Sequence, residues 1–157
     1  MFQLSSDGKA AVMKELGRYE AKDSAIIPAL YIAQKENKGW INTEVIHHLA
    51  EVMSIPVAKI SEVFTFYTMF NQKPVGKYHV QVCTNISCAL NGSRELADQI
   101  CKELKVGLDQ VTADGRFTVS RVECLGSCGT APMMQINDNY YENLTLESAT
   151  NILRGMR

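Results

Sequence analysis

Two short cysteine pairs constrain this chain more than any other feature. Four residues separate Cys83 from Cys88, three separate Cys124 from Cys128, and 35 residues separate the two pairs. Two local pairs joined by a long connection indicate two loops that fold around one object. Two disulfides, a structural zinc ion and an iron–sulfur cluster all use four cysteines.

The spacing within the pairs favours an iron–sulfur centre and leaves zinc and disulfides open as alternatives. Structural zinc sites usually use C-x2-C pairs, because two residues are enough to place both sulfurs on one ion. A [2Fe–2S] centre is larger, and a C-x4-C spacing occurs in ferredoxins. Gly126 and Gly129 would let the backbone approach sulfur and direct N–H groups at it.

The first part of the chain, residues 1–72, carries apolar side chains at helical spacing, which predicts a small helical bundle. Capping and turn residues indicate where the helices begin and end. We expect one helix from Ser6 or Asp7 to about Tyr19, a second from Ser24 to the turn at Asn37, a third from Asn42 through Met53, and a fourth from Pro56 to Tyr67.

In the second part, residues 73–157, the pattern becomes alternating. The predicted order is β-α-β-β-β-α, which makes the whole chain α+β. The helix between the first two strands predicts that these strands pair in parallel, so both cysteine pairs should lie at the carboxyl edge of the sheet. We expect strands at Tyr78–Val82 and Phe117–Val122, a hairpin of Met133–Ile136 with Tyr140–Tyr141, and helices at Asn91–Leu104 and from Thr145 or Leu146 to about Leu153.

Composition and charge exclude several classes of function. The chain is 46% hydrophobic and 21% charged, as in ordinary globular proteins, and its net charge of −1 offers no basic field to nucleic acid or an anionic membrane. The segment Met1–Gly8 does not resemble a signal peptide, and the charge-free run Cys124–Asn137 is shorter than the roughly 20 residues a spanning helix needs. We expect a reducing compartment, which disfavours disulfides, and membrane association only through partners.

Several motifs together resemble one family. The chain is similar, from about Ala25 to Leu153, to the thioredoxin-like [2Fe–2S] ferredoxin subunit of respiratory NADH:quinone oxidoreductase (complex I), the E-type subunit. The motifs that carry this resemblance are Val80–Cys88, Val122–Cys128, Ala131-Pro132, Gln135–Asp138, Gly39-Trp40, Thr65–Phe70 and Pro74–Tyr78.

The resemblance implies a helical bundle at residues 1–72, a thioredoxin-like domain at residues 73–157, and one [2Fe–2S] cluster bound by Cys83, Cys88, Cys124 and Cys128. It implies a subunit without its own substrate site that exchanges single electrons with the FMN of a partner, the F-type subunit, which also binds NADH. A further iron–sulfur subunit is a candidate second partner. The complex would lie peripherally on the cytoplasmic side of the inner membrane, and related NAD(P)-linked hydrogenases and formate dehydrogenases are an alternative parent complex.

Other chemically notable residues have simpler interpretations. Cys101 falls on the inner face of its predicted helix and is expected to be a small core residue. His47 and His48 are adjacent, so they point about 100° apart on a helix and are expected at the surface. His79 lies on a strand and is not expected to bind metal. Pro132 is a candidate cis proline.

Two remaining interpretations concern charge. Arg94 and Arg121 are either cations that soften the negative charge of the cluster or ordinary surface residues. Residues 49–60 are spaced like a helix-turn-helix, so a redox-sensing transcription factor is a second class of function. Its would-be recognition helix offers Lys59 and little else to contact phosphate groups, which disfavours this alternative.

Overall fold

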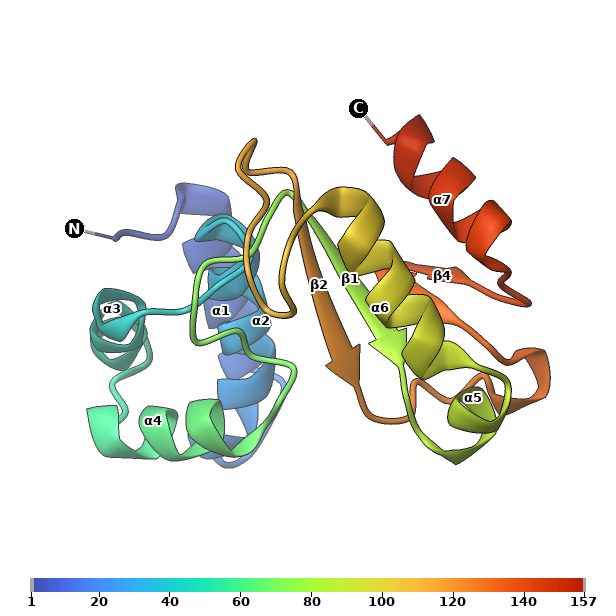
Figure 1. Ribbon diagram of the computed structural model, residues 1–157. Helices are drawn as coiled ribbons and strands as arrows, with labels where there is room; N and C mark the ends of the chain where they lie inside the picture. Colours follow the sequence, from blue (N-terminus) through green and yellow to red (C-terminus); the bar gives the residue numbers. More distant parts are fainter. Residues whose placement is uncertain (1, 157) are drawn as a thin grey trace. The chain divides into compact units, whose positions relative to one another are not determined.

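The computed structural model describes residues 2–156 (Figure 1), and the chain divides into two compact units. One unit ends at Pro74 and the other begins at Val75, two residues after the boundary that the sequence suggested. Each unit buries its own hydrophobic core.

The first unit is the helical bundle that the period of its apolar residues predicts. Its centre consists of fully buried aliphatic side chains such as Leu30, Leu49 and Ile60, which come from three different helices. The elements are α1 (Ser6–Leu16), the 3₁₀ turn η1 (Lys22–Ala25), α2 (Ile26–Glu36), α3 (Thr43–Met53) and α4 (Val57–Phe66).

The ends of these helices agree only partly with the capping residues chosen from the sequence. Asn42 begins α3 as predicted, because its side chain accepts a hydrogen bond from the N–H of Val45 at 3.0 Å. The predicted capping residue of α1, Ser6 or Asp7, was one or two residues late, since Ser5 is the capping residue. The predicted start of α2 was wrong, since Ser24 lies inside η1.

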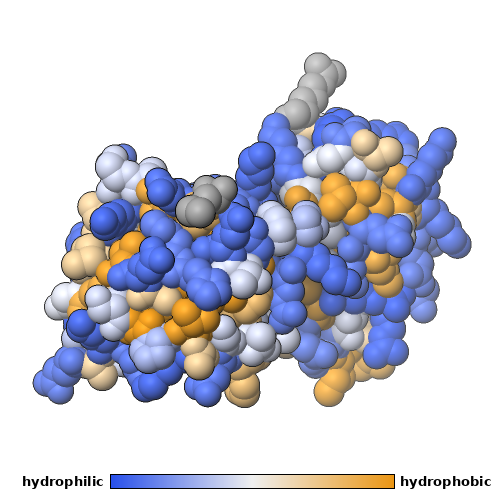
Figure 2. All heavy atoms as spheres, turned by 90° about the vertical axis from the view of Figure 1, so that its left-hand side faces the viewer, coloured by the Kyte–Doolittle hydropathy of each residue, from blue (hydrophilic) through white to orange (hydrophobic). Residues whose placement is uncertain are grey.

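The aromatic residues around the end of α4 divide between core and surface. Phe64 and Phe70 are buried, whereas Phe66 is 76% exposed. Tyr67, predicted to be the last residue of the fourth helix, instead follows the last residue of α4 and is 36% exposed. Figure 2 shows apolar residues interspersed with hydrophilic ones on the face it presents.

The second unit is built on a four-stranded sheet with strand order β2-β1-β3-β4. Strands β1 (Tyr78–Cys83) and β2 (Phe117–Val122) are parallel, as the sequence predicts. Their register places Cys83 beside Val122. The remaining elements are α5 (Ile86–Leu90), α6 (Ser93–Leu104), the 3₁₀ turn η2 (Cys128–Thr130), β3 (Met134–Ile136), β4 (Asn139–Tyr141) and α7 (Leu146–Gly155).

The two faces of the central strands differ in polarity because successive side chains alternate across a strand. One face carries Val80 and Val119, which pack with residues of α6 and α7 in the core of the second unit. The other face carries the buried polar residues His79, Thr118 and Ser120, and His79 Nε2 lies 2.8 Å from Ser120 Oγ.

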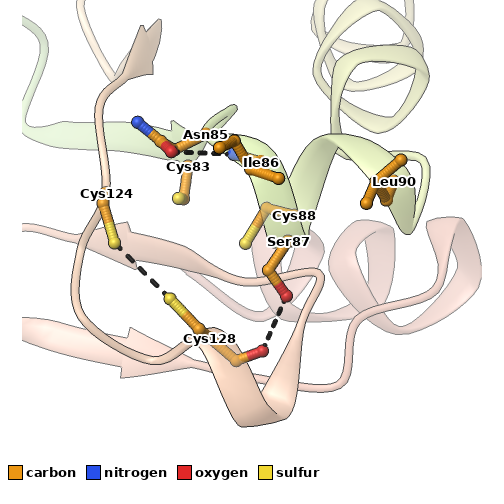
Figure 3. A pocket seen from close by; sticks show the side chains of 8 residues that line it. All are labelled: Cys83, Asn85, Ile86, Ser87, Cys88, Leu90, Cys124 and Cys128. Carbon is orange, nitrogen blue, oxygen red and sulfur yellow. Dashed lines mark hydrogen bonds between the residues drawn. The ribbon is translucent and has the colours of Figure 1, made fainter.

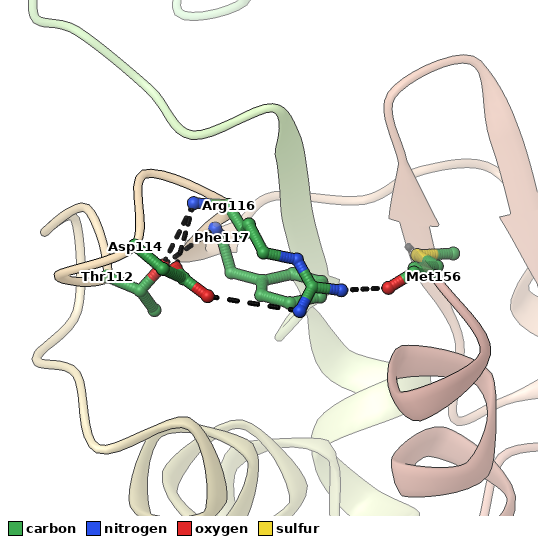
Figure 4. A network of polar contacts seen from close by, with 5 residues as sticks. All are labelled: Thr112, Asp114, Arg116, Phe117 and Met156. Atoms are coloured by element: carbon green, nitrogen blue, oxygen red, sulfur yellow. Dashed lines mark hydrogen bonds and ion pairs between the residues drawn. The ribbon is translucent and has the colours of Figure 1, made fainter.

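A polar turn fixes the start of β2 (Figure 4). The hydroxyl of Thr112 accepts a hydrogen bond from the N–H of Phe117 at 2.9 Å and donates to Asp114 Oδ1 at 2.5 Å. Arg116 in the same turn donates to the carbonyl of Met156, which ties the turn to the chain just after α7. These bonds hold the first residue of the strand whose last residue leads to Cys124.

No helix within residues 2–156 combines the length and apolar character needed to cross a membrane.

Candidate metal centre

The structure brings the four candidate ligand residues together at one edge of the sheet. Cys83 ends β1 and Cys88 lies in α5, while Cys124 follows β2 and Cys128 begins η2. Because β1 and β2 are parallel neighbours, the two loops leave the sheet at the same end. The cysteines line one pocket of about 420 Å³ (Figure 3), together with Asn85, Ile86, Ser87 and Leu90.

The thiols are arranged as two pairs. Cys124 Sγ lies 3.6 Å from Cys128 Sγ, too far for a disulfide bond, and all five cysteines are free. The side chains of Cys83 and Cys88 interact by a hydrogen bond. Within residues 2–156, no three His, Cys, Asp or Glu side chains lie where they could hold a single ion. The four sulfurs therefore lie as two contacting pairs, one from each loop.

The two pairs differ strongly in burial. Cys83 and Cys88 are 3% and 2% exposed and pack with the fully buried Met133, whereas Cys124 and Cys128 are exposed. Burial raises the pKa of the Cys88 thiol, and the hydrogen bond with Cys83 raises this pKa further. The pKa of Cys128 is raised chiefly by its hydrogen bond with Cys124. Both shifts disfavour the thiolate forms of Cys88 and Cys128 unless a cation lies beside their sulfurs.

Polar side chains of the first loop join it to the second. Asn85 caps α5 by accepting from the N–H of Ile86 at 2.8 Å, and its amide also donates to Glu123 Oε2 at 2.6 Å. Ser87 Oγ donates to the carbonyl of Cys128 at 2.8 Å (Figure 3). The relative position of the two loops is thus fixed by the chain itself, next to the cysteines.

The second loop contains an N–H···S hydrogen bond of the kind predicted. Gly126 has φ +84°, a conformation that L side chains rarely adopt, and its N–H points at Cys124 Sγ at 3.4 Å. Such a donor stabilises negative charge on sulfur. Gly129 lies within η2.

A contact that the sequence did not reveal holds the same loop from outside. Segment 140–144, at and after β4, forms hydrogen bonds with the loop at residues 125–132, for example from Tyr140 Oη to the carbonyl of Leu125 at 2.7 Å. No local pattern signals these contacts, because the partners are 12 to 15 residues apart. The Ala131–Pro132 peptide bond at the end of the loop is cis, which confirms Pro132 as a cis proline.

The other residues considered from the sequence lie outside the pocket. Cys101 packs against the core of the second unit, as expected. His79 is buried beside Ser120. His47 is exposed, but His48 is half-buried and accepts a hydrogen bond from the N–H of Leu4, so its expected surface position was wrong. Arg121 donates to Asp98 of α6 at 2.6 Å, and Arg94 is exposed.

Comparison with known proteins gives one consistent result. Residues 12–157 match the model of the family described as thioredoxin-like [2Fe–2S] ferredoxin. The chain is 48% identical over 132 residues to the E subunit of NADH-quinone oxidoreductase from Rickettsia conorii, and the match covers 84% of this chain and 79% of that protein. It is 40% identical over 154 residues to the mitochondrial NADH dehydrogenase [ubiquinone] flavoprotein 2 of Dictyostelium discoideum, and this match covers 97% of this chain and 62% of that protein.

Among solved structures, the fold resembles that of an NAD⁺-reducing [NiFe]-hydrogenase in the air-oxidized state. The TM-score is 0.68 at 22% sequence identity, and the match covers 80% of this chain. The chain spans only 22% of the hydrogenase chain, so the likeness concerns the fold of one part of that protein.

Proposed function

The chain belongs to the thioredoxin-like [2Fe–2S] ferredoxin family, and from this premise we propose that it is an electron-transfer subunit of NADH:quinone oxidoreductase. In this proposal Cys83, Cys88, Cys124 and Cys128 bind one [2Fe–2S] cluster. The observation that carries it is the convergence of two sulfur pairs, from loops far apart in sequence, in one pocket at the carboxyl ends of two parallel strands.

The residues present fit such a group. Thiolates are soft ligands that suit iron–sulfur clusters, and two pairs of sulfurs match a centre with two metal ions. The N–H of Gly126 supplies a hydrogen bond to one of the exposed sulfurs. When bound, a cluster of this kind takes up and releases one electron at a time. The chain's part is to supply thiolates, to keep one pair dry, and to fix the distance between the loops.

We infer that the electron partner is a component of the same complex that binds FMN and NADH, the F-type subunit, and that the complex lies peripherally on the cytoplasmic side of the inner membrane. The names of the relatives support membership of such a complex. Ile86 and Leu90, which line the pocket, are 76% and 83% exposed, and exposed apolar side chains beside a redox site suit a partner surface. An NAD-linked hydrogenase remains an alternative parent complex.

A DNA-binding function has less support. In α4, the would-be recognition helix, Lys59 forms an ion pair with Asp23. The side chain that would contact phosphate is therefore engaged within the bundle.

The cluster assignment is tested by loading the full chain with iron and sulfide. We expect two iron and two sulfide ions per chain and a one-electron EPR signal on reduction. Alanine substitutions at each of the four pocket cysteines, which leave no ligand atom in the side chain, should abolish this signal, while Cys101→Ala, the matched control away from the pocket, should keep it. A chain that binds one zinc ion and no sulfide would contradict the assignment.

The partner assignment is tested by co-expression with the FMN-binding, F-type subunit from the same source. We expect a stable complex in which the cluster is reduced when NADH is added. Ile86→Asp combined with Leu90→Asp should weaken the complex but leave the EPR signal of the isolated chain unchanged. If the wild-type chain forms no complex with the F-type subunit, the partner assignment is wrong.

A further inference from the structure

A short stretch of chain holds the second cysteine loop in place from outside the pocket. We call residues 140–144, which include the last two residues of β4, the brace segment. Three of its hydrogen bonds go to main-chain carbonyls of the loop and so fix its path independently of side chains there. They join Tyr140 Oη to Leu125 O at 2.7 Å, Asn143 N to Thr130 O at 2.8 Å, and Leu144 N to Pro132 O at 2.9 Å.

Glu142, in the middle of the brace segment, contacts the loop through side chains. Its Oε1 atom accepts hydrogen bonds from the hydroxyls of both Ser127 and Thr130, the latter at 2.7 Å. The two hydroxyl oxygens also lie 2.7 Å from each other. These bonds, first that from Ser127 and then that from Thr130, lower the pKa of Glu142, so the carboxylate is ionised at neutral pH. Hydrogen bonds to an ionised acceptor are stronger than neutral ones.

The position of Ser127 gives this contact its meaning. Ser127 lies between Cys124 and Cys128 and directly precedes the second of them. Cys83 and Cys88 are held by close packing with Met133, but Cys124 and Cys128 are exposed and have no comparable packing. An exposed loop of this kind needs polar contacts to keep one conformation, because ordering its residues costs backbone conformational entropy.

We propose that Glu142 is a positioning residue of the metal centre. Through the hydroxyls of Ser127 and Thr130 it holds the loop so that the sulfurs of Cys124 and Cys128 stay side by side. This inference rests on the proposed function, since it assigns the loop a metal to bind. The residue that fixes the position of Cys124 and Cys128 would then lie outside both cysteine loops, in a segment that follows the last cysteine.

The first test needs no metal. Amide hydrogen exchange is measured across residues 125–130 in the full apoprotein, under reducing conditions. We expect Glu142→Ala to speed exchange there about tenfold, the scale set by one lost hydrogen bond to a charged group. Glu142→Gln should keep most of the protection, because Oε1, the atom that accepts both hydroxyls, is retained. Glu147→Ala, which removes another exposed carboxylate of the same unit, is the control and should leave exchange unchanged.

The second test uses the chain loaded with iron and sulfide and follows loss of its visible absorbance after an iron chelator is added. Glu142→Ala should lose the chromophore several-fold faster than wild type, with Glu142→Gln close to wild type. If Glu142→Ala matches wild type in both tests, or if Glu142→Gln is as impaired as Glu142→Ala, the positioning role is refuted. A wild-type chain that binds no iron and sulfide would refute the proposed function instead, and the exchange result would still decide whether Glu142 holds the loop.

Discussion

The contrast in burial between the two cysteine pairs predicts that equivalent substitutions will have different effects on the apoprotein. Cys83 is 3% exposed and has Cys88, Met133, Leu125 and Ala131 around it, whereas Cys124 is exposed. Cys83→Ser replaces a weakly polar thiol with a hydroxyl among largely apolar neighbours. Cys124→Ser makes the same chemical change in contact with water.

The expected magnitudes follow from the environment of each hydroxyl. Burying a hydroxyl without a good hydrogen-bond partner lowers the free energy of unfolding by about 1 to 2 kcal/mol. A substitution at an exposed position usually changes it by no more than about 0.5 kcal/mol. We therefore expect Cys83→Ser to lower the free energy of unfolding of the second unit by about 1 to 2 kcal/mol. Cys124→Ser should leave it nearly unchanged. Both variants should change the EPR signal of the loaded chain, because an oxygen atom replaces a thiolate sulfur at one ligand position.

The assay must report on the second unit. The single tryptophan, Trp40, lies in the first unit, so tryptophan fluorescence would follow the wrong part of the chain. Native-state hydrogen exchange of amides in β1 and β2, measured against urea on the reduced apoprotein, reports the correct unit. Equal loss of stability in Cys83→Ser and Cys124→Ser would refute the assigned difference in burial.

Three further predictions concern the second unit. Gly126→Ala should destabilise the loop by about 1 kcal/mol and speed loss of the cluster to a chelator, because φ is +84° there although space for a methyl group is open; unchanged loss rates would contradict this. Gly76→Ala should lower the free energy of unfolding by more, about 2 to 3 kcal/mol in urea unfolding, because the added carbon would lie 2.6 Å from the backbone of Phe117. A variant with wild-type stability would show that the backbone there can move. Burial lowers the pKa of His79, against the opposing effect of Asp109, so as pH falls the imidazole is protonated in the unfolded chain before it is protonated in the folded chain. The stability of the second unit should therefore fall as pH drops below about 6.5. His79→Gln should flatten this dependence of stability on pH, whereas His47→Gln, at an exposed position, should not.

The parts of the fold that could be predicted from the sequence are those with a local pattern. Strand β2 begins at Phe117 and ends at Val122 as predicted, because its buried residues lie in a run bounded by turn residues. The convergence of the cysteine loops was also predictable, since a helix between two strands implies parallel pairing. The cysteines' role as ligands stays a prediction.

The parts that were missed lack such a pattern. Helix α5 was not predicted because its apolar residues Ile86 and Leu90 face solvent, the reverse of an amphipathic helix packed on a core. Its one local signal is Asn85, which caps it. The brace segment was missed because its bonds depend on how β4 returns beside the loop. Tyr67 was misplaced because the helical period was extended one residue beyond Phe66, where α4 ends.

The contrast between the two sulfur pairs also suggests why the second loop depends on hydrogen bonds. A site that passes electrons to another protein needs one side close to that protein, so it cannot be closed by a core on every side. The buried pair at Cys83 and Cys88 is held by packing, which is rigid and keeps these two sulfurs away from solvent. The exposed pair at Cys124 and Cys128 remains accessible, so its geometry must come from bonds that tolerate water, such as those of Glu142 and Tyr140. The second loop is thereby both exposed and held in one conformation. The residues that stabilise it, Tyr140 and Glu142, follow the cysteines in the sequence and leave the sulfurs of Cys124 and Cys128 uncovered.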